Sequence, residues 1–132
     1  MKKIFVLFFL SITFIGVSQE IMKLKKVEPA KDYDNILVQK LNSDDFQSSF
    51  VIWIKKEVKL HKHTHHTENI YVIEGKGEMR IGKETYQVKK GDYFNIPKNT
   101  PHALKVTSSK PMKVLSIQSP KFLGQDRIFI EE

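Results

Sequence analysis

The sequence contains no cysteine among its 132 residues. This absence excludes disulfide bonds, lipoprotein attachment through a cysteine, and thiolate ligands for a metal ion. The sequence also lacks an internal repeat, a low-complexity segment and a linker. We therefore expect a single domain of ordinary size.

Long apolar runs are missing except near the N-terminus, where residues 4–17 are almost uninterruptedly apolar behind two lysines. This run is shorter than the ~20 residues that a membrane-spanning helix needs. The pattern is typical of a secretory signal peptide over residues 1–18, with cleavage near Ser18-Gln19. We therefore expect a periplasmic or secreted protein whose mature domain covers residues 19–132, with no stable membrane insertion after processing.

The positive charge is modest and dispersed. The formal net charge of +7 falls to +5 when residues 1–18 and their two lysines are removed. The remaining lysines are scattered, whereas nucleic-acid binding favours a dense basic stripe with interleaved aromatic residues. The composition thus predicts no nucleic-acid partner and leaves room for a mild preference for anionic small molecules.

Four of the five histidines lie in one tract, His61-Lys62-His63-Thr64-His65-His66-Thr67-Glu68. The flanking segments, residues 50–54 and 70–73, are rich in β-branched and aromatic residues, which favours strands over a helix. Residues two apart on a strand project from the same face. His61 and His63 are therefore expected to point the same way.

Further metal donors have to come from elsewhere in the fold. Glu68 follows His63 closely enough for its carboxylate to turn inward from the next strand, and His102 follows a turn-rich stretch that opens another apolar strand. Imidazole and carboxylate donors suit divalent Fe, Mn, Ni, Zn or Cu without selecting sharply among them. The alternative is that the tract is a solvated edge or an adventitious metal-binding segment.

Two spaced motifs resemble those of the cupin superfamily, in its small single-domain (cupin 2) type. The first consists of His61, His63, Glu68 and Gly75, and the second of Gly91, Pro97 and His102. Together they cover residues 60–106. The resemblance implies one metal ion, Fe, Mn, Zn or Ni, held inside a small β-barrel. The implied ligands are His61, His63, Glu68 and His102.

The sequence departs from the family pattern at three positions that are not metal donors. Lys55 and Asn99 stand where the family usually has glycine, and Val106 stands where it often has asparagine. Asparagine tolerates a left-handed backbone conformation better than most residues. The turn at Asn99 is therefore expected to form.

No catalytic residue is assigned by a motif. His65 and His66 are expected in a loop near the mouth of the site, with substrate contact or proton transfer as the alternative. Tyr93 is a weak candidate for substrate binding and is expected mainly to pack against neighbouring residues. Trp53 is expected in the core or at a subunit contact.

Closely spaced short strands predict an all-β barrel or sandwich. The resemblance implies, more narrowly, a single antiparallel β-barrel or jelly roll of the cupin-like double-stranded β-helix type. After an arm with one short strand over residues 22–27, strands are expected over residues 35–41, 50–54, 61–63, 68–73, 78–81, 85–88, 93–96, 102–106, 112–117 and 127–130. The apolar run 50–54 is expected to be covered on both faces. The last strand is expected at a sheet edge or exchanged with a second copy.

Several functions fit these expectations. The first is a metalloenzyme acting on a small polar metabolite, as a dioxygenase, isomerase or lyase. The alternative is a non-catalytic, metal-dependent binding module for a sugar or an organic acid, and a third reading is a purely structural metal. Outward-facing apolar residues and the terminal strand also predict a homodimer.

Overall fold

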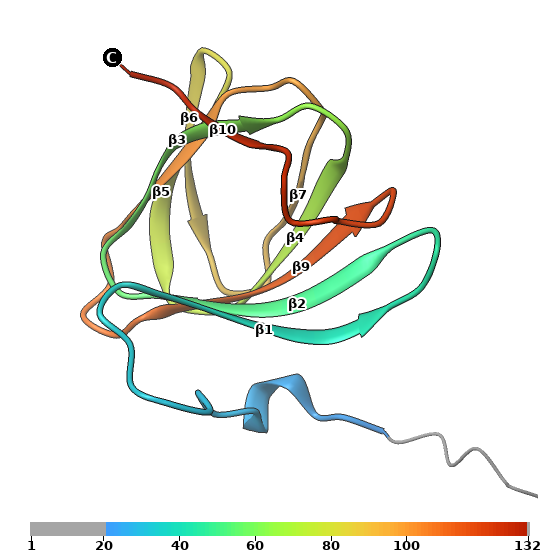
Figure 1. Cartoon of the computed structure of the whole chain (residues 1–132). Coiled ribbons are helices and arrows are strands. Elements are labelled where there is room, and N and C mark those ends of the chain that lie inside the picture. The colour runs from blue at the N-terminus through green and yellow to red at the C-terminus, as the bar shows by residue number, and fades with distance from the viewer. Residues whose placement is uncertain (1–20, 132) are drawn as a thin grey trace, which may run out of the picture.

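The protein is described here by a computed structural model of residues 21–131. The fold is nearly all β, as predicted: two five-stranded antiparallel sheets face each other as a jelly roll rather than forming one closed barrel (Figure 1). The strand orders are β1-β2-β9-β4-β7 and β10-β3-β8-β5-β6. The signal peptide expected over residues 1–18 lies outside the described residues.

Most strands fall within three residues of the ranges expected from the sequence. They are β1 (Ile36–Ser43), β2 (Ser48–Ile54), β3 (Glu57–His63), β4 (Thr67–Glu74), β5 (Lys76–Ile81), β6 (Glu84–Lys89), β7 (Tyr93–Ile96), β8 (His102–Val106), β9 (Met112–Ser119) and β10 (Arg127–Phe129). Neighbouring strands run antiparallel, so short turns connect several of them.

The main hydrophobic core lies between the two sheets. Alternate residues of each strand point into it, as the period of two requires. On β4, Ile70 and Val72 are buried there, in the same inward register as Glu68, while Tyr71 between them is 44% exposed. The inward face of β4 therefore carries one carboxylate at the end of an apolar row.

Strand β2 is buried on both faces, which confirms the interpretation of its unbroken apolar run. Ile54 joins the core between the sheets, whereas Val51 and Trp53 belong to a second cluster on the outer face. Trp53 is only 4% exposed, so it is a core residue. Leu24 and Val27 of the N-terminal arm pack against this second cluster.

The arm corrects one prediction: the strand expected over residues 22–27 is a short 3-10 helix, η1 (Leu24–Lys26). The backbone amides of Lys26 and Val27 donate to the carbonyls of Lys23 and Leu24, at 2.8 and 3.2 Å. Leu24 and Val27 are three residues apart, so one 3-10 turn places both against the outer cluster. The packing of these two partly buried side chains thus outweighs the local strand pattern.

The C-terminal strand β10 pairs with β3 of its own chain, at the edge of the second sheet (Figure 1). The register places Arg127 opposite His63 and Phe129 opposite His61. The last described segment therefore lies directly beside the histidine tract. Among residues 21–131, no helix is long and apolar enough to cross a membrane.

Candidate metal centre

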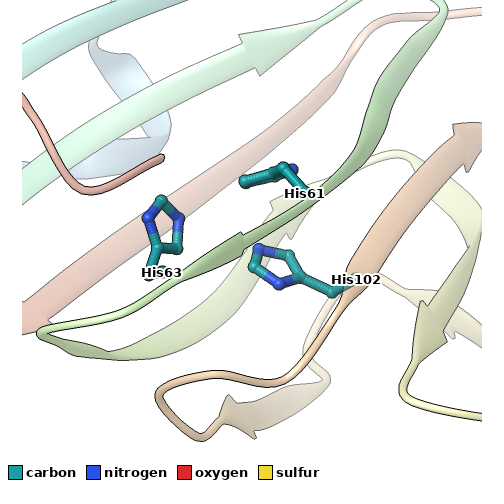
Figure 2. Close-up of side chains that lie close together, drawn as sticks. All are labelled: His61, His63 and His102. Carbon is teal, nitrogen blue, oxygen red and sulfur yellow. The ribbon is translucent and has the colours of Figure 1, made fainter. Parts of the chain in front are cut away.

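The four donors implied by the motifs come from three strands and are all buried. His61 and His63 lie on β3, Glu68 on β4 and His102 on β8, with exposed fractions of 2, 3, 7 and 3%. His61 and His102 are direct partners across the β3–β8 ladder. Figure 2 shows the rings of His61, His63 and His102 gathered around one space.

The three imidazoles are close enough to share one ion. Each offers a ring nitrogen, and these three nitrogens lie within 4.8 Å of one another. The ring centroids are 4.1 Å apart for His61 and His102, and 4.9 Å apart for His61 and His63. A shift in β-ladder register between Val58 and His61 marks an irregularity in β3 just before the site, and such bulges often redirect side chains beside functional sites.

Backbone carbonyls fix the orientation of two of the rings. His61 Nδ1 lies 2.8 Å from the carbonyl oxygen of Lys59, and His102 Nδ1 lies 2.9 Å from that of Thr100. A carbonyl only accepts, so each Nδ1 carries the proton and each Nε2 keeps a free lone pair. This is the tautomer that a metal-binding imidazole needs when its second nitrogen is hydrogen-bonded.

Glu68 is oriented by side chains of β9. Its Oε1 accepts hydrogen bonds from Ser116 Oγ at 2.5 Å and Gln118 Nε2 at 3.1 Å. Its Oε2 is turned toward the histidines, 3.9 Å from His63 Nε2 and 3.7 Å from His102 Nε2. One carboxylate oxygen is thus held by the protein and the other faces the imidazoles.

Burial also sets the protonation of the site. Burial opposes ionisation of Glu68, but hydrogen bonds from Ser116 and Gln118, with the nearby histidines, hold its pKa below the usual range. Burial lowers the pKa of His61 to about 4 and of His63 to about 4, and it also lowers the pKa of His102. At neutral pH the site therefore offers neutral imidazoles and a carboxylate.

These residues fit a divalent cation. The Nε2 atoms of His63 and His102 are buried and have no hydrogen-bond partner within residues 21–131. A buried polar atom without a partner is costly, and an ion bound between the rings would satisfy both atoms. The donor set of neutral imidazoles with one carboxylate suits a borderline transition metal.

A histidine–carboxylate pair, His66 and Asp126, adjoins the centre and was not predicted. His66 is 2% exposed, although the sequence placed it in a loop near the mouth; it is in the β3–β4 loop, but inside the protein. Its Nδ1 lies 2.8 Å from Asp126 Oδ2, and its ring centroid lies 4.1 Å from that of His63. The Nε2 of His66 is buried without a partner among the described residues.

Asp126 was missed because no motif marks it. It precedes β10 by one residue, and only the pairing of Arg127 with His63 brings it to the histidine tract. Its Oδ1 lies 3.3 Å from His63 Nδ1, and its Oδ2 accepts the backbone N–H of His65 at 3.1 Å. Burial opposes its ionisation, but the His65 hydrogen bond and the neighbouring imidazoles lower its pKa, so it is a carboxylate.

The other weak candidates lie away from the centre. His65 is exposed, and its Nδ1 lies 2.6 Å from Thr64 Oγ1. Tyr93 is 65% exposed on the outer face of β7, and its hydroxyl donates to Asn69 Oδ1 at 2.7 Å. Tyr93 therefore neither packs in the core nor reaches the histidines.

A cavity of about 70 Å³ reaches the centre from the apolar interior. His61, Glu68 and His102 form one part of its wall, and most of the remainder is aliphatic or aromatic. Its other lining residues include Ile52, Ile54, Val58, Ile70, Met79, Phe94, Ile96, Leu104 and Arg127. The donors thus face a small, largely apolar space.

The described backbone also explains the motif position that departs from glycine. Asn99 adopts φ +64°, which confirms that asparagine sustains the left-handed turn. Its backbone amide donates to the carbonyl oxygen of His63 at 2.6 Å. The turn before His102 is thereby tied to the strand that carries two of the other donors.

Comparison with known proteins identifies the family to which the chain is similar. The family model described as the cupin domain matches residues 50–118, just over half of the chain. An uncharacterized protein of Aquifex aeolicus is 35% identical over 98 residues, covering 74% of this chain and 80% of its own length. An uncharacterized protein of Methanocaldococcus jannaschii is 33% identical over 81 residues, covering 61% of this chain. That match spans 65% of the Methanocaldococcus protein.

The chain is also similar to an enzyme in sequence and to a solved structure in fold. L-ectoine synthase of Aliivibrio fischeri is 30% identical over 89 residues, covering 65% of this chain and 70% of the enzyme. The crystal structure of a Klebsiella pneumoniae protein with a double-stranded β-helix domain has a TM-score of 0.71 at 16% identity. It covers 87% of this chain and 100% of that protein. This structural likeness concerns the fold alone.

Proposed function

This chain belongs to the cupin-domain family, and from that premise we propose that it binds one divalent transition metal and acts there on a small polar metabolite. The proposed ligands are His61, His63, Glu68 and His102. The metal is Fe, Mn, Zn or Ni, because imidazole and carboxylate donors suit all four.

The observation that carries this proposal is the pair of buried imidazole nitrogens without partners. The Nε2 atoms of His63 and His102 face Glu68 Oε2 at 3.9 and 3.7 Å, where a cation would be shared by all three. Among the described residues, no lysine or arginine forms an ion pair with the Glu68 carboxylate. Its negative charge is thus available to a cation.

A metal ion bound here would supply Lewis-acid or oxygen-activating chemistry. The chain itself would hold the ion, exclude bulk water through its apolar cavity wall, and keep a buried acid–base group nearby. That group is His66: Asp126 accepts its Nδ1–H, which leaves the Nε2 lone pair free to take a proton. A dioxygenase, an isomerase and a lyase all fit these features.

The second candidate is a binding module for a sugar or an organic acid without turnover. One observation favours it: no tyrosine lines the cavity. Tyr71 and Tyr93 are 44 and 65% exposed on the outer face of their sheet, and Tyr86 is 50% exposed on the edge strand β6. The acid–base groups near the metal are then restricted to histidines and carboxylates. A purely structural zinc is less well supported because such sites usually recruit cysteine.

A metabolite screen separates the two candidates. Protein loaded separately with iron(II), manganese(II), zinc(II) and nickel(II) is incubated with a mixture of small polar metabolites, and mass spectrometry follows consumption and product formation. Products that appear only with metal, and not with the isosteric variant Glu68→Gln, support the enzyme. Retention of a metabolite without conversion supports the binding module. If no metal gives either turnover or retention, both candidate functions are contradicted.

We also propose that the mature domain begins near Gln19 and acts in the periplasm or outside the cell. The support is the sequence pattern of residues 1–18. Expression of the full chain in a Gram-negative host, followed by fractionation and N-terminal sequencing, tests this. Unprocessed protein in the cytoplasm would contradict it.

A homodimer is proposed on the basis of exposed apolar side chains at a sheet edge. Strand β1 is an edge strand, and its Ile36 and Val38 are 36 and 46% exposed. Pairing of this edge with a second copy would cover them. Analytical ultracentrifugation at tens of micromolar should show a dimer; a monomer throughout would contradict the proposal.

A further inference from the structure

One cationic side chain stands beside the proposed metal centre. Arg127 lines the same cavity as His61, Glu68 and His102. It lies on β10 opposite His63. The pairing with His63 and the shared cavity place Arg127 beside the centre rather than on a remote surface.

The face of β10 that carries Arg127 is turned toward the site. Phe129, two residues along the strand, has its ring centroid 6.0 Å from that of His61. Residues two apart on a strand share a face, so Arg127 points to the same side. Both side chains are largely exposed, whereas His61 and Glu68 are buried. Arg127 and Phe129 therefore stand at an open part of the site.

The charge of Arg127 has no partner in contact with it among the described residues. Within residues 21–131 its guanidinium forms neither an ion pair nor a hydrogen bond. A fixed positive charge at this position repels a bound metal cation, and an anion bound between Arg127 and the metal would be attracted by both.

The cavity limits what that anion can be. Its volume is about 70 Å³, where one water molecule needs roughly 10–15 Å³. Its wall beyond the donors is formed by apolar side chains such as Ile70, Met79 and Phe94. A polyhydroxylated sugar would leave hydroxyl groups unpaired against this wall, and unpaired buried polar groups are costly. A ligand with a short aliphatic body suits this apolar cavity.

We propose that the ligand of this site is a small monocarboxylate with a short aliphatic body, whose carboxylate is bound by Arg127 beside the metal and whose aliphatic part enters the apolar cavity. This inference rests on the metal centre of the proposed function. Arginine suits the role because its planar guanidinium can form two parallel hydrogen bonds with one carboxylate.

The test uses the full chain loaded with cobalt(II) and two probes of nearly equal shape, 3-methylbutanoate and its uncharged amide, 3-methylbutanamide. Isothermal titration calorimetry measures each affinity for the parent, for Arg127→Gln and for Arg80→Gln. Arg80→Gln is the matched control because it removes the same charge at the second of the two arginines in the sequence. Arg80 lies on β5 and lines a different pocket. A chelator competition measures the cobalt affinity of each protein without carboxylate.

We expect the parent to bind 3-methylbutanoate at least tenfold more tightly than the amide. Arg127→Gln should weaken binding of the acid about 10–100-fold, as expected for a charge-assisted hydrogen bond, while Arg80→Gln leaves it unchanged. In carboxylate-free buffer, Arg127→Gln should bind cobalt about 3–10-fold more tightly, because a repulsive charge is gone. This opposite change in the two affinities is specific to the proposed role.

Three results would overturn the inference: no binding of 3-methylbutanoate to the loaded parent, equal binding of acid and amide, or equal acid affinity in the parent and Arg127→Gln. These outcomes leave the metal centre intact. If the parent takes up neither cobalt nor iron, manganese, zinc or nickel, the proposed function itself fails and the inference falls with it. If cobalt alone is rejected, the same titrations use the metal that binds, so the metal titration distinguishes the two failures.

Discussion

The carboxylate of Asp126 bridges two imidazoles: its Oδ2 lies 2.8 Å from His66 Nδ1 and its Oδ1 lies 3.3 Å from His63 Nδ1. His63 is the proposed metal ligand whose Nδ1 is held by a carboxylate, whereas His61 and His102 are held by backbone carbonyls. A residue from the C-terminal segment therefore orients a ring on β3, more than sixty positions away.

Replacing this carboxylate should weaken metal binding. The charge of Asp126 orients the His63 ring and makes its Nε2 a stronger base, and Asp126→Asn removes this charge. Loss of such a partner typically costs about 10–100-fold in metal affinity. Competition with a chromophoric chelator measures the effect. Asp45→Asn is the control, because Asp45 is exposed and its one ion pair within residues 21–131 is with Lys121, at 3.6 Å. Unchanged affinity in Asp126→Asn would show that His63 is oriented without it.

The turn before His102, inside the second motif, should depend on its left-handed residue. Asn99 has φ +64° and is exposed, so Asn99→Ala should cost about 1–2 kcal/mol through backbone strain alone. Asn99→Gly relieves that strain and should change stability by less than about 0.5 kcal/mol. Urea denaturation of the metal-free variants gives both values. Equal effects of alanine and glycine would contradict the backbone explanation.

A buried lysine should hold the N-terminal arm in place. Lys113 on β9 is 3% exposed, and its Nζ donates to the carbonyl oxygens of Val27 at 2.5 Å and Lys25 at 3.3 Å. Lys113→Met keeps the apolar stem and removes these hydrogen bonds, which should cost about 1–3 kcal/mol.

The arm covers Trp53, the only tryptophan, so its release should shift the fluorescence emission to longer wavelength. Trypsin should also cleave within residues 23–26 sooner than in the parent. Lys110→Met removes an exposed lysine and serves as control. Native emission together with parent-like stability in Lys113→Met would mean that apolar packing alone retains the arm.

The stability of the metal-free protein should fall as the pH is lowered from about 6.5 toward 4. Burial lowers the pKa of His61 and His63 to about 4, whereas histidine in an unfolded chain titrates near 6.5. Between these values the unfolded chain binds more protons, so acid favours unfolding. Above pH 6.5 these two residues should contribute no pH dependence.

Urea midpoints of chelator-treated protein at pH 7, 6 and 5 measure this slope. His61→Gln removes one buried imidazole and should flatten it, while His65→Gln removes an exposed one and should keep it. A constant midpoint across this range for the parent would contradict neutral, buried imidazoles in the metal-free site.

Periodicity made most of the fold predictable. The alternation after Glu68 places Ile70 and Val72 in the core, and the unbroken run of β2 predicts burial on both faces; both expectations are confirmed. These patterns are local, because each residue's face follows from its own strand. The histidines His61 and His63 share a face for the same reason.

What the sequence did not reveal depends on contacts between distant segments. The arm forms a 3-10 turn because Leu24 and Val27 find an apolar surface on another strand. The burial of His66 and the position of Asp126 follow from the pairing of β10 with β3, and no local pattern encodes that pairing. A carboxylate one residue before a possible edge strand was the only available signal.

The central claim is that the buried donors bind one metal ion, and elemental analysis of the untagged protein tests it most directly. The parent, the double variant His63→Ala/His102→Ala and the control His65→Ala are purified anaerobically and incubated with iron(II), manganese(II), zinc(II) or nickel(II). We predict close to one ion per chain in the parent and in the control for at least one metal, and almost none in the double variant. A parent that stays empty with every ion, or a double variant that retains a full equivalent, would contradict the claim.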